Sequence, residues 1–234
     1  MQNSEEAASI IPALMPEQFS DIEKAAEQFA PFVECMQIDV MDGVFVSNTS
    51  WPYGVDQWSE VEQLAQRELQ LPHKGAFHYE AHLMVSEPER IGELLARGGV
   101  ERLIMHVETL EGIDVESMCA SWKAARASEI GVAILLDTPI ERIEPYLHVI
   151  SFIQVMGIDK VGFQGESFDQ RALAKIGAIR NMYPGVPLEF DGGVGITTIA
   201  RIVSAGVSRL VVGSALMNAT DAKKAYDDLT NAIQ

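Results

Sequence analysis

The chain has 234 residues, of which 47% are hydrophobic and 22% are charged, and its formal net charge at pH 7 is −17. This composition is typical of a globular protein, and the length suits one large domain spanning residues 1–234, although by length alone two small domains are equally plausible. The negative charge excludes non-specific binding to nucleic acid or to an anionic membrane, because both require basic surfaces. A phosphorylated ligand would therefore have to be held by local backbone N–H groups and helix N-termini.

The first residues and the cysteines bear on the compartment. Residues 1–8 lack the basic start and apolar core of a secretory signal, and no later apolar run is long enough to span a bilayer. The two cysteines, Cys35 and Cys119, do not have metal-ligand spacing and fit a reducing environment. We therefore expect a cytoplasmic protein without a membrane segment.

Short apolar runs alternate with segments of helical periodicity, which is the pattern of repeated strand–helix units around a parallel sheet. Eight strands are expected, at residues 9–14, 35–40, 80–85, 102–107, 132–136, 150–156, 187–190 and 209–213. Helices are expected between them, for instance at residues 17–29, 88–96, 117–127, 169–182 and 197–204. Eight such units without a linker predict an α/β fold, a single (β/α)8 TIM barrel.

The connection over residues 51–79 is too long for a simple loop. It should contain the second helix, followed by an extra loop that holds His73 and His78. An exposed loop histidine is usually only solvated, so we assign neither residue to a site.

The carboxyl ends of parallel strands converge on one mouth of a barrel, where several polar side chains are predicted to meet. These are Gln37 and Asp39 from the second strand, His82 from the third, His106 and Glu108 from the fourth, and Asp191 from the seventh. Asp39 lies inside an apolar run, where an ionised carboxylate requires a metal, another cation or a proton-transfer role. Taken singly, a strand histidine is more often a core residue, so only Asp39, His82 and Asp191 together predict a site for Zn, Mn, Fe or Co.

Two glycine-containing turns and one Asp-Gly turn allow both structural and functional interpretations. Gly192-Gly193 follows the seventh strand and Gly213-Ser214 follows the eighth, where barrels of this type commonly bind phosphate. Glycine lets the backbone approach a phosphate closely, but it also serves ordinary tight turns. Asp42, just before Gly43, is interpreted as a turn residue or as a residue that supports the site.

Five segments carry a pattern that is more specific than any single residue. They are Gln-Ile-Asp-Val-Met-Asp-Gly-Val-Phe-Val-Ser-Asn (37–48), Ala-His-Leu-Met-Val-Ser-Glu-Pro-Glu-Arg (81–90), Met-His-Val-Glu (105–108), Phe-Asp-Gly-Gly-Val (190–194) and Val-Val-Gly-Ser-Ala-Leu (211–216). In order and spacing they resemble the ribulose-phosphate 3-epimerase family. The resemblance extends over nearly the whole chain.

The resemblance implies a metal-dependent epimerase that acts on a ketopentose 5-phosphate, most simply ribulose 5-phosphate. Two aspartates, Asp39 and Asp191, would exchange the proton at carbon 3 through an enediolate, and a divalent metal would stabilise its charge. The metal would be held by Asp39, His82, Asp191 and the residue at position 37. The site would be lined by three methionines, Met41, Met84 and Met156. Family members are commonly homo-oligomers, so the resemblance also implies a homo-oligomer.

This chain departs from the family pattern at three places. Gln37 stands where the family has a metal-binding histidine, and Ala13 stands where it has a serine in the first-strand motif. The loop at residues 158–166 replaces the family's Val-Asn-Pro-Gly-Phe-Gly-Gly-Gln, with Asp159 and Glu166 near an incoming phosphate and Lys160 to offset them. An amide oxygen in place of a nitrogen donor should weaken Zn binding and favour Mn or Mg.

Two hypotheses of function follow. The first is an epimerase or a close isomerase of a phosphorylated ketose, which the retained Asp39, His82 and Asp191 favour. The second is a diverged, non-catalytic barrel that binds a phosphorylated metabolite or a protein partner, which the three departures favour. Decarboxylation is disfavoured, because Met41 occupies the position of the lysine that related barrels use to protonate a carbanion. Metal content would discriminate between the two hypotheses.

Overall fold

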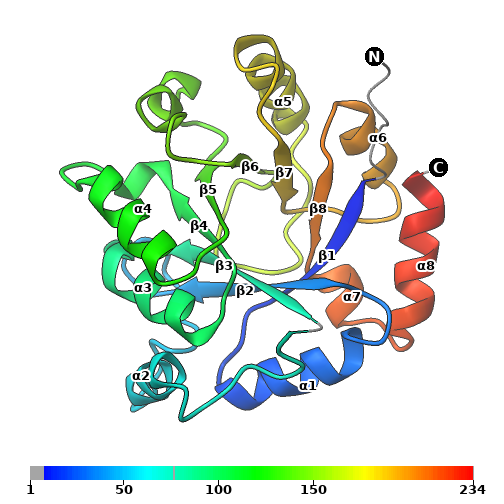
Figure 1. Ribbon diagram of the computed structural model, residues 1–234. Helices are drawn as coiled ribbons and strands as arrows, with labels where there is room; N and C mark the ends of the chain where they lie inside the picture. Colours follow the sequence, from blue (N-terminus) through cyan, green and yellow to red (C-terminus); the bar gives the residue numbers. More distant parts are fainter. Residues whose placement is uncertain (1–7, 76, 234) are drawn as a thin grey trace.

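A closed barrel of eight parallel strands forms the centre of the protein, and helices surround it (Figure 1). The computed structural model describes residues 8–75 and 77–233. The strands are β1 (Ser9–Leu14), β2 (Cys35–Met41), β3 (His78–Met84), β4 (Arg102–His106), β5 (Glu129–Ile134), β6 (Phe152–Met156), β7 (Leu188–Asp191) and β8 (Arg209–Val212). Each strand pairs with the next one, and β8 pairs with β1. The predicted (β/α)8 TIM barrel is therefore confirmed.

The second strand illustrates how the sequence gives the barrel a polar interior. All seven residues of β2 are buried, and successive side chains of a strand point to opposite faces of the sheet. Ile38 and Val40 belong to the large apolar core between the barrel and the helices. Gln37 and Asp39 therefore point to the other face, toward the barrel axis. This alternation brings a carboxylate and an amide into a buried interior.

The α-helices differ in length around the barrel. They are α1 (Phe19–Phe29), α2 (Trp58–Gln66), α3 (Pro88–Gly98), α4 (Val115–Ala124), α5 (Arg171–Met182), α6 (Ile199–Ser204), α7 (Ser214–Met217) and α8 (Ala222–Ile233). Two 3-10 helices, η1 (Val107–Thr109) and η2 (Ile140–Tyr146), follow β4 and β5. Pro145 lies inside η2 and has no backbone N–H to donate, which disfavours an α-helix there. Within residues 8–75 and 77–233, no helix is long and apolar enough to cross a membrane.

The structure moves several of the predicted boundaries, and two strand starts move toward the N-terminus by two or three residues. The fifth strand begins at Glu129, three residues before the predicted start, because the preceding Glu129 to Gly131 segment pairs with β4. The third strand begins at His78, which therefore lies in a strand rather than in the preceding loop. The predicted second helix is present as α2, and the extra loop between α2 and β3 is also present.

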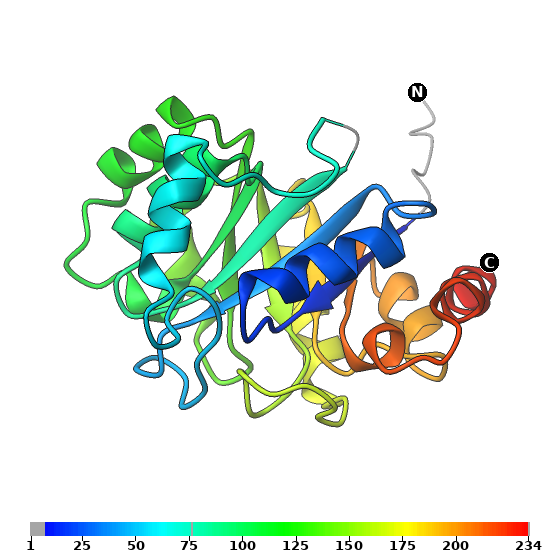
Figure 2. The same cartoon turned by 90° about the horizontal axis from the view of Figure 1, so that it is seen from below.

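Two long loops cover the carboxyl ends of the strands. The loop between β2 and α2 and the loop between β6 and α5 lie at the same end of the barrel, the lower end in Figure 2. They are joined where the Asn48 side chain donates a hydrogen bond to the Gly162 carbonyl at 3.2 Å. The Gln164 side chain donates to the Ala13 carbonyl at 3.1 Å, which ties the second loop to β1. Residues 162–166 of the second loop line a cavity at this end of the barrel.

Candidate active site

Asp39, His82 and Asp191 meet at the carboxyl end of the barrel. Asp39 and His82 are register partners on β2 and β3, and Asp191 ends β7. Nδ1 of His82 lies 3.3 Å from Oδ1 of Asp39 and 3.2 Å from Oδ2 of Asp191. One donor atom from each residue lies within 4.8 Å of the others. Three strands that are distant in sequence thus bring two carboxylates and one imidazole together.

Two glutamine amides complete this polar cluster. Nε2 of Gln37 donates to Oδ1 of Asp39 at 2.7 Å and to Oδ2 of Asp191 at 3.0 Å. Nε2 of Gln154, from β6, donates to the same oxygen of Asp191 at 3.2 Å. Both glutamines are fully buried. Gln154 is not among the residues predicted from the sequence; its only signal there is a polar residue inside the apolar strand Phe-Ile-Gln-Val-Met.

The electrostatics of the cluster keep a positive charge between the carboxylates. Burial acts to lower the pKa of His82, but the hydrogen bonds and charges of Asp191 and Asp39 outweigh it and raise the pKa to about 9. Burial raises the pKa of Asp39, and the nearby charge of Asp191 adds to this effect. At neutral pH the His82 imidazolium therefore balances part of the negative charge of the two aspartates.

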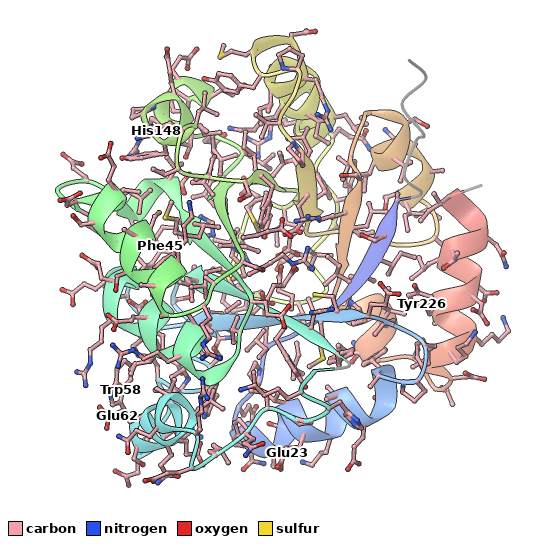
Figure 3. All side chains as sticks on the ribbon, viewed as in Figure 1. Glu23, Phe45, Trp58, Glu62, His148 and Tyr226 are labelled. Carbon is pink, nitrogen blue, oxygen red and sulfur yellow. The ribbon has the colours of Figure 1, made fainter. Side chains whose placement is uncertain are left out.

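His82 also belongs to a chain of buried side chains that leads away from the carboxylates. Its Nε2 lies 2.8 Å from Nε2 of His106, and Nδ1 of His106 lies 3.0 Å from Oε2 of Glu108. The other carboxylate oxygen of Glu108 accepts a hydrogen bond from the Leu135 backbone at 3.0 Å. Phe45, labelled in Figure 3, lies with its ring centroid 4.7 Å from that of His106. His106 and Glu108 were predicted to lie at this end of the barrel, without an assigned role.

A cavity of about 60 Å³ lies directly above the two carboxylates. Its lining includes most of the other predicted site residues, namely His82, Met84, Met156, Gly192, Gly193, Gly213 and Ser214. Met41 packs beside this cavity, against Met84 and Val46. The structure therefore brings the predicted aspartates and glycine turns to one place.

The glycines of the turn after β7 are required by the backbone. Gly192 has a φ of +108° and Gly193 a φ of +68°, values that other residues rarely adopt. A Cβ atom on Gly193 would lie 2.5 Å from Cα of Phe168. The structural interpretation of this turn is therefore supported, and phosphate binding by its backbone stays a prediction. The two are compatible, because a turn without side chains also exposes its backbone to the cavity.

Comparison with known proteins identifies the family. The model of the "Ribulose-phosphate 3 epimerase family" matches residues 7–217. The chain belongs to the ribulose-phosphate 3-epimerase family. It is 29% identical to ribulose-phosphate 3-epimerase of Schizosaccharomyces pombe over 228 residues, which cover 97% of this chain and 94% of the relative. It is 27% identical over 232 residues to the cytoplasmic isoform of Oryza sativa, with 97% and 95% covered. Membership confirms the resemblance noted above and makes the chain an isomerase.

Solved structures confirm the fold of this epimerase-family protein. KGPDC from Streptococcus mutans superposes with a TM-score of 0.71 at 15% identity, over 97% of this chain and 98% of the other. Orotidine 5'-phosphate decarboxylase from Pyrococcus horikoshii superposes with a TM-score of 0.64 at 18% identity, over 96% and 99%. At these identities the likeness concerns the barrel alone.

In the divergent loop after β6, Asp159 is held outside the cavity by an ion pair. Asp159 forms an ion pair of 2.7 Å with Arg171, and Arg171 also binds Asp169 and Asp137 at 2.7 Å each. Arg171 therefore offsets only part of the negative charge of these three aspartates, but its ion pair with Asp159 fixes the position of that carboxylate. Glu166, in contrast, lines the cavity. Asp159 and Glu166 were both predicted to lie near an incoming phosphate, and of the two only Glu166 lines the cavity.

A layer of buried charges lies below the polar cluster in this epimerase-family chain. Glu80 is the register partner of Gln37 and forms an ion pair of 2.9 Å with Arg102. Among the described residues, neither carboxylate oxygen of the fully buried Glu189 has a hydrogen-bond partner. Burial and the charge of Glu80 raise the pKa of Glu189 well above its ordinary value. The layer beneath the cluster is therefore polar, and Arg102 offsets the charge of Glu80.

Proposed function

We propose that this chain is a ribulose-phosphate 3-epimerase, which interconverts ribulose 5-phosphate and xylulose 5-phosphate. One observation carries the proposal: the carboxylates of the buried Asp39 and the partly buried Asp191 approach the same imidazole nitrogen of His82, directly beneath a cavity. Paired carboxylates in a buried site are suited to moving a proton. Family membership supports the same reaction.

In the reaction that we assign to the site, one aspartate acts as the base and the other as the acid, and these roles are exchanged in the reverse reaction. One carboxylate removes the proton from carbon 3, and the electron pair moves to the carbonyl to form an enediolate. The other aspartate, which begins the reaction as the protonated carboxylic acid, gives its proton to the opposite face of carbon 3, and the two protonation states are exchanged for the reverse reaction. Asp39 and Asp191 come from strands β2 and β7, so they can reach the bound sugar from two directions. Asp39 is buried, which limits the access of water that would compete for its proton, whereas Asp191 is partly buried and lines the cavity.

The residues present fit a divalent metal ion. Asp39, His82 and Asp191 supply two carboxylates and one imidazole with donor atoms within 4.8 Å of one another, a set that suits Mn, Fe, Co or Zn. The buried Oε1 of Gln37 has no hydrogen-bond partner among the described residues, so it is free to contribute. A bound cation would supply positive charge next to the enediolate. His82 would then bind through its neutral form.

We assign substrate phosphate binding to the backbone of the turns after β7 and β8, at Gly192-Gly193 and Gly213-Ser214. These residues line the cavity, and the net charge of −17 leaves no general attraction for an anion. Met84 and Met156 would then pack against the carbon chain of the sugar.

The experiment that tests the proposal is exchange of hydrogen for deuterium at carbon 3, followed by NMR in heavy water. A panel of ketose phosphates would be tested with Mn, Zn, Fe and Co in turn. We expect exchange with ribulose 5-phosphate, at a rate that depends on the metal. Exchange into none of the sugars with any metal would overturn the proposal and would favour the diverged, non-catalytic barrel.

A further inference from the structure

We propose that Gln154 is a further ligand of the divalent cation, and that it acts with Gln37 as an amide pair that shifts the site's preference from Zn toward Mn or Mg. The proposal rests on the proposed function only in using the same cluster of Asp39, His82 and Asp191. Its test measures metal binding without a substrate, so the two proposals can fail separately.

The side-chain amide of Gln154 lies beside two of the three candidate metal ligands. Its Nε2 lies 3.2 Å from Oδ2 of Asp191 and 3.4 Å from Nδ1 of His82. These two residues are within the set that can hold a metal. Gln154 reaches them from β6, whereas Gln37 reaches the same Asp191 oxygen from β2. The two amides therefore approach the cluster from different strands.

The amide oxygens of Gln37 and Gln154 also support the proposal. Oε1 of Gln37 and Oε1 of Gln154 are both buried, and neither has a hydrogen-bond partner among the described residues. A buried acceptor without a partner is unfavourable, and two of them in one cluster call for an explanation. The Nε2 groups of both glutamines donate hydrogen bonds to the carboxylates. They thereby stabilise the negative charge of the two aspartates, which is also what a bound cation would do.

Rotation of each amide group by half a turn would let the same two side chains serve the metal-free and the metal-bound site. The rotation exchanges the oxygen and nitrogen positions with almost no movement of the other atoms. In one orientation the N–H groups of Gln37 and Gln154 donate to carboxylates, as the structure has them. In the other orientation both oxygens face the cluster and can bind a cation. A cation would thus remove two unpaired acceptors at once.

The resulting donor set predicts the preference among metals. Two carboxylates, two amide oxygens and one imidazole give four oxygen donors and one nitrogen. Mn and Mg favour oxygen donors and more than four ligands, whereas Zn favours fewer ligands with nitrogen or sulfur among them. Gln37 alone exchanges one donor for another, but Gln154 adds a fifth. The simpler alternative is that Gln154 only donates a hydrogen bond to Asp191, and this alternative predicts no specific effect on Mn.

Calorimetric titration of the metal-free protein with Mn and with Zn distinguishes these alternatives, and electron paramagnetic resonance of bound Mn gives a second readout. We expect Gln154→Leu to raise Kd for Mn at least tenfold and to raise Kd for Zn less. Gln154→Asn keeps a buried amide but shortens its reach, so it should have the same effect. Gln37→His combined with Gln154→Leu should favour Zn further. Gln66→Leu, exposed on α2, is the matched control and should change neither Kd.

Several results would overturn the inference. They are unchanged Mn affinity in both folded Gln154 variants, an equal loss of Mn and Zn affinity, or failure of the unaltered protein to bind Mn. Circular dichroism would establish that both variants are folded. If the unaltered protein binds Mn through Gln154 but shows no hydrogen exchange on any sugar, this inference is supported and the proposed epimerase activity is wrong. If the protein shows hydrogen exchange on a sugar but the Gln154 variants bind Mn as the unaltered protein does, the epimerase activity is supported and this inference is wrong.

Discussion

His82 and His106 face each other through their Nε2 atoms at 2.8 Å, so one nitrogen donates the hydrogen bond and the other accepts it. Burial acts to lower the pKa of His82, but the two aspartates outweigh this effect and raise the pKa to about 9. The pKa of His106 is lowered, mainly by burial. His82 is therefore the donor, and neutral His106 donates in turn from Nδ1 to Glu108. This direction leaves Nδ1 of His82 fixed toward Asp39 and Asp191.

The first prediction concerns this arrangement. His106→Phe should reduce kcat by roughly tenfold to a hundredfold, because His82 would lose a buried acceptor that holds its orientation. Steady-state kinetics on the best sugar of the panel would measure the change. His148→Phe is the control, since His148 is exposed at the edge of the molecule (Figure 3). Equal kcat values for the two variants would contradict an orienting role for His106.

The second prediction concerns the two proton carriers. Asp39→Asn and Asp191→Asn should each lower the rate of hydrogen exchange at carbon 3 by about 10²- to 10⁴-fold, because an amide cannot accept the proton. Asn has nearly the same size and shape as Asp, so the fold should persist. Asp137→Asn is a suitable control, because that carboxylate is 81% exposed and, among the described residues, forms an ion pair with Arg171 alone. Near-normal exchange in either site variant would rule out a two-carboxylate mechanism.

The third prediction concerns the phosphate. Gly213→Ala should raise KM about tenfold for the phosphorylated ketose with a smaller effect on kcat, because the methyl group would enter the cavity and displace one hydrogen bond to the phosphate. The added Cβ would lie 3.2 Å from the flexible end of Gln164, so folding should be preserved. Gly177→Ala on α5 meets no atom within 4 Å and serves as the control. Equal activity on the unphosphorylated ketose would show that the phosphate is bound elsewhere or not at all.

The fourth prediction concerns Asp42, which has a structural role in the loop after β2. One of its oxygens accepts hydrogen bonds from the Val44 and Phe45 backbone at 2.8 and 3.0 Å, and the other accepts two from Ser86 at 2.7 Å. Burial acts to raise the pKa of Asp42, but these hydrogen bonds outweigh it and lower the pKa below its ordinary value. The hydrogen bonds from Ser86 join the loop to the end of β3, so Asp42 supports the site from outside the cavity.

A carboxylate with a lowered pKa in the folded state stabilises the fold above its unfolded pKa of about 4, and this stability is lost as pH falls through the folded pKa. Asp42→Asn should therefore lower the free energy of unfolding at pH 7 by about 1–2 kcal/mol. The difference between the two proteins should shrink as the pH falls below about 4. Urea unfolding followed over a range of pH measures this. A difference that is the same at pH 7 and at pH 3 would contradict the assignment.

The sequence by itself determined the barrel and the convergence of the three central residues. Alternating apolar residues in β2, such as Ile38 and Val40, predict a strand because a half-turn per residue places them on one face. Once eight strand–helix units are recognised, parallel pairing requires Asp39, His82 and Asp191 to meet at one end. The glycines of the turn after β7 were likewise visible, because few other residues adopt their φ values.

Only the tertiary structure decided which further side chains belong to the site. Gln154 lies in an apolar strand and gains its meaning from closure of the barrel, which places β6 beside β7 and brings its amide to Asp191. The pairing of Asp159 with Arg171 depends on the path of a loop that no periodicity describes. Periodicity reports which face of an element is buried, but it carries no information on what lies across the barrel axis. Those distances arise from the curvature and closure of the sheet, which all eight strands determine together.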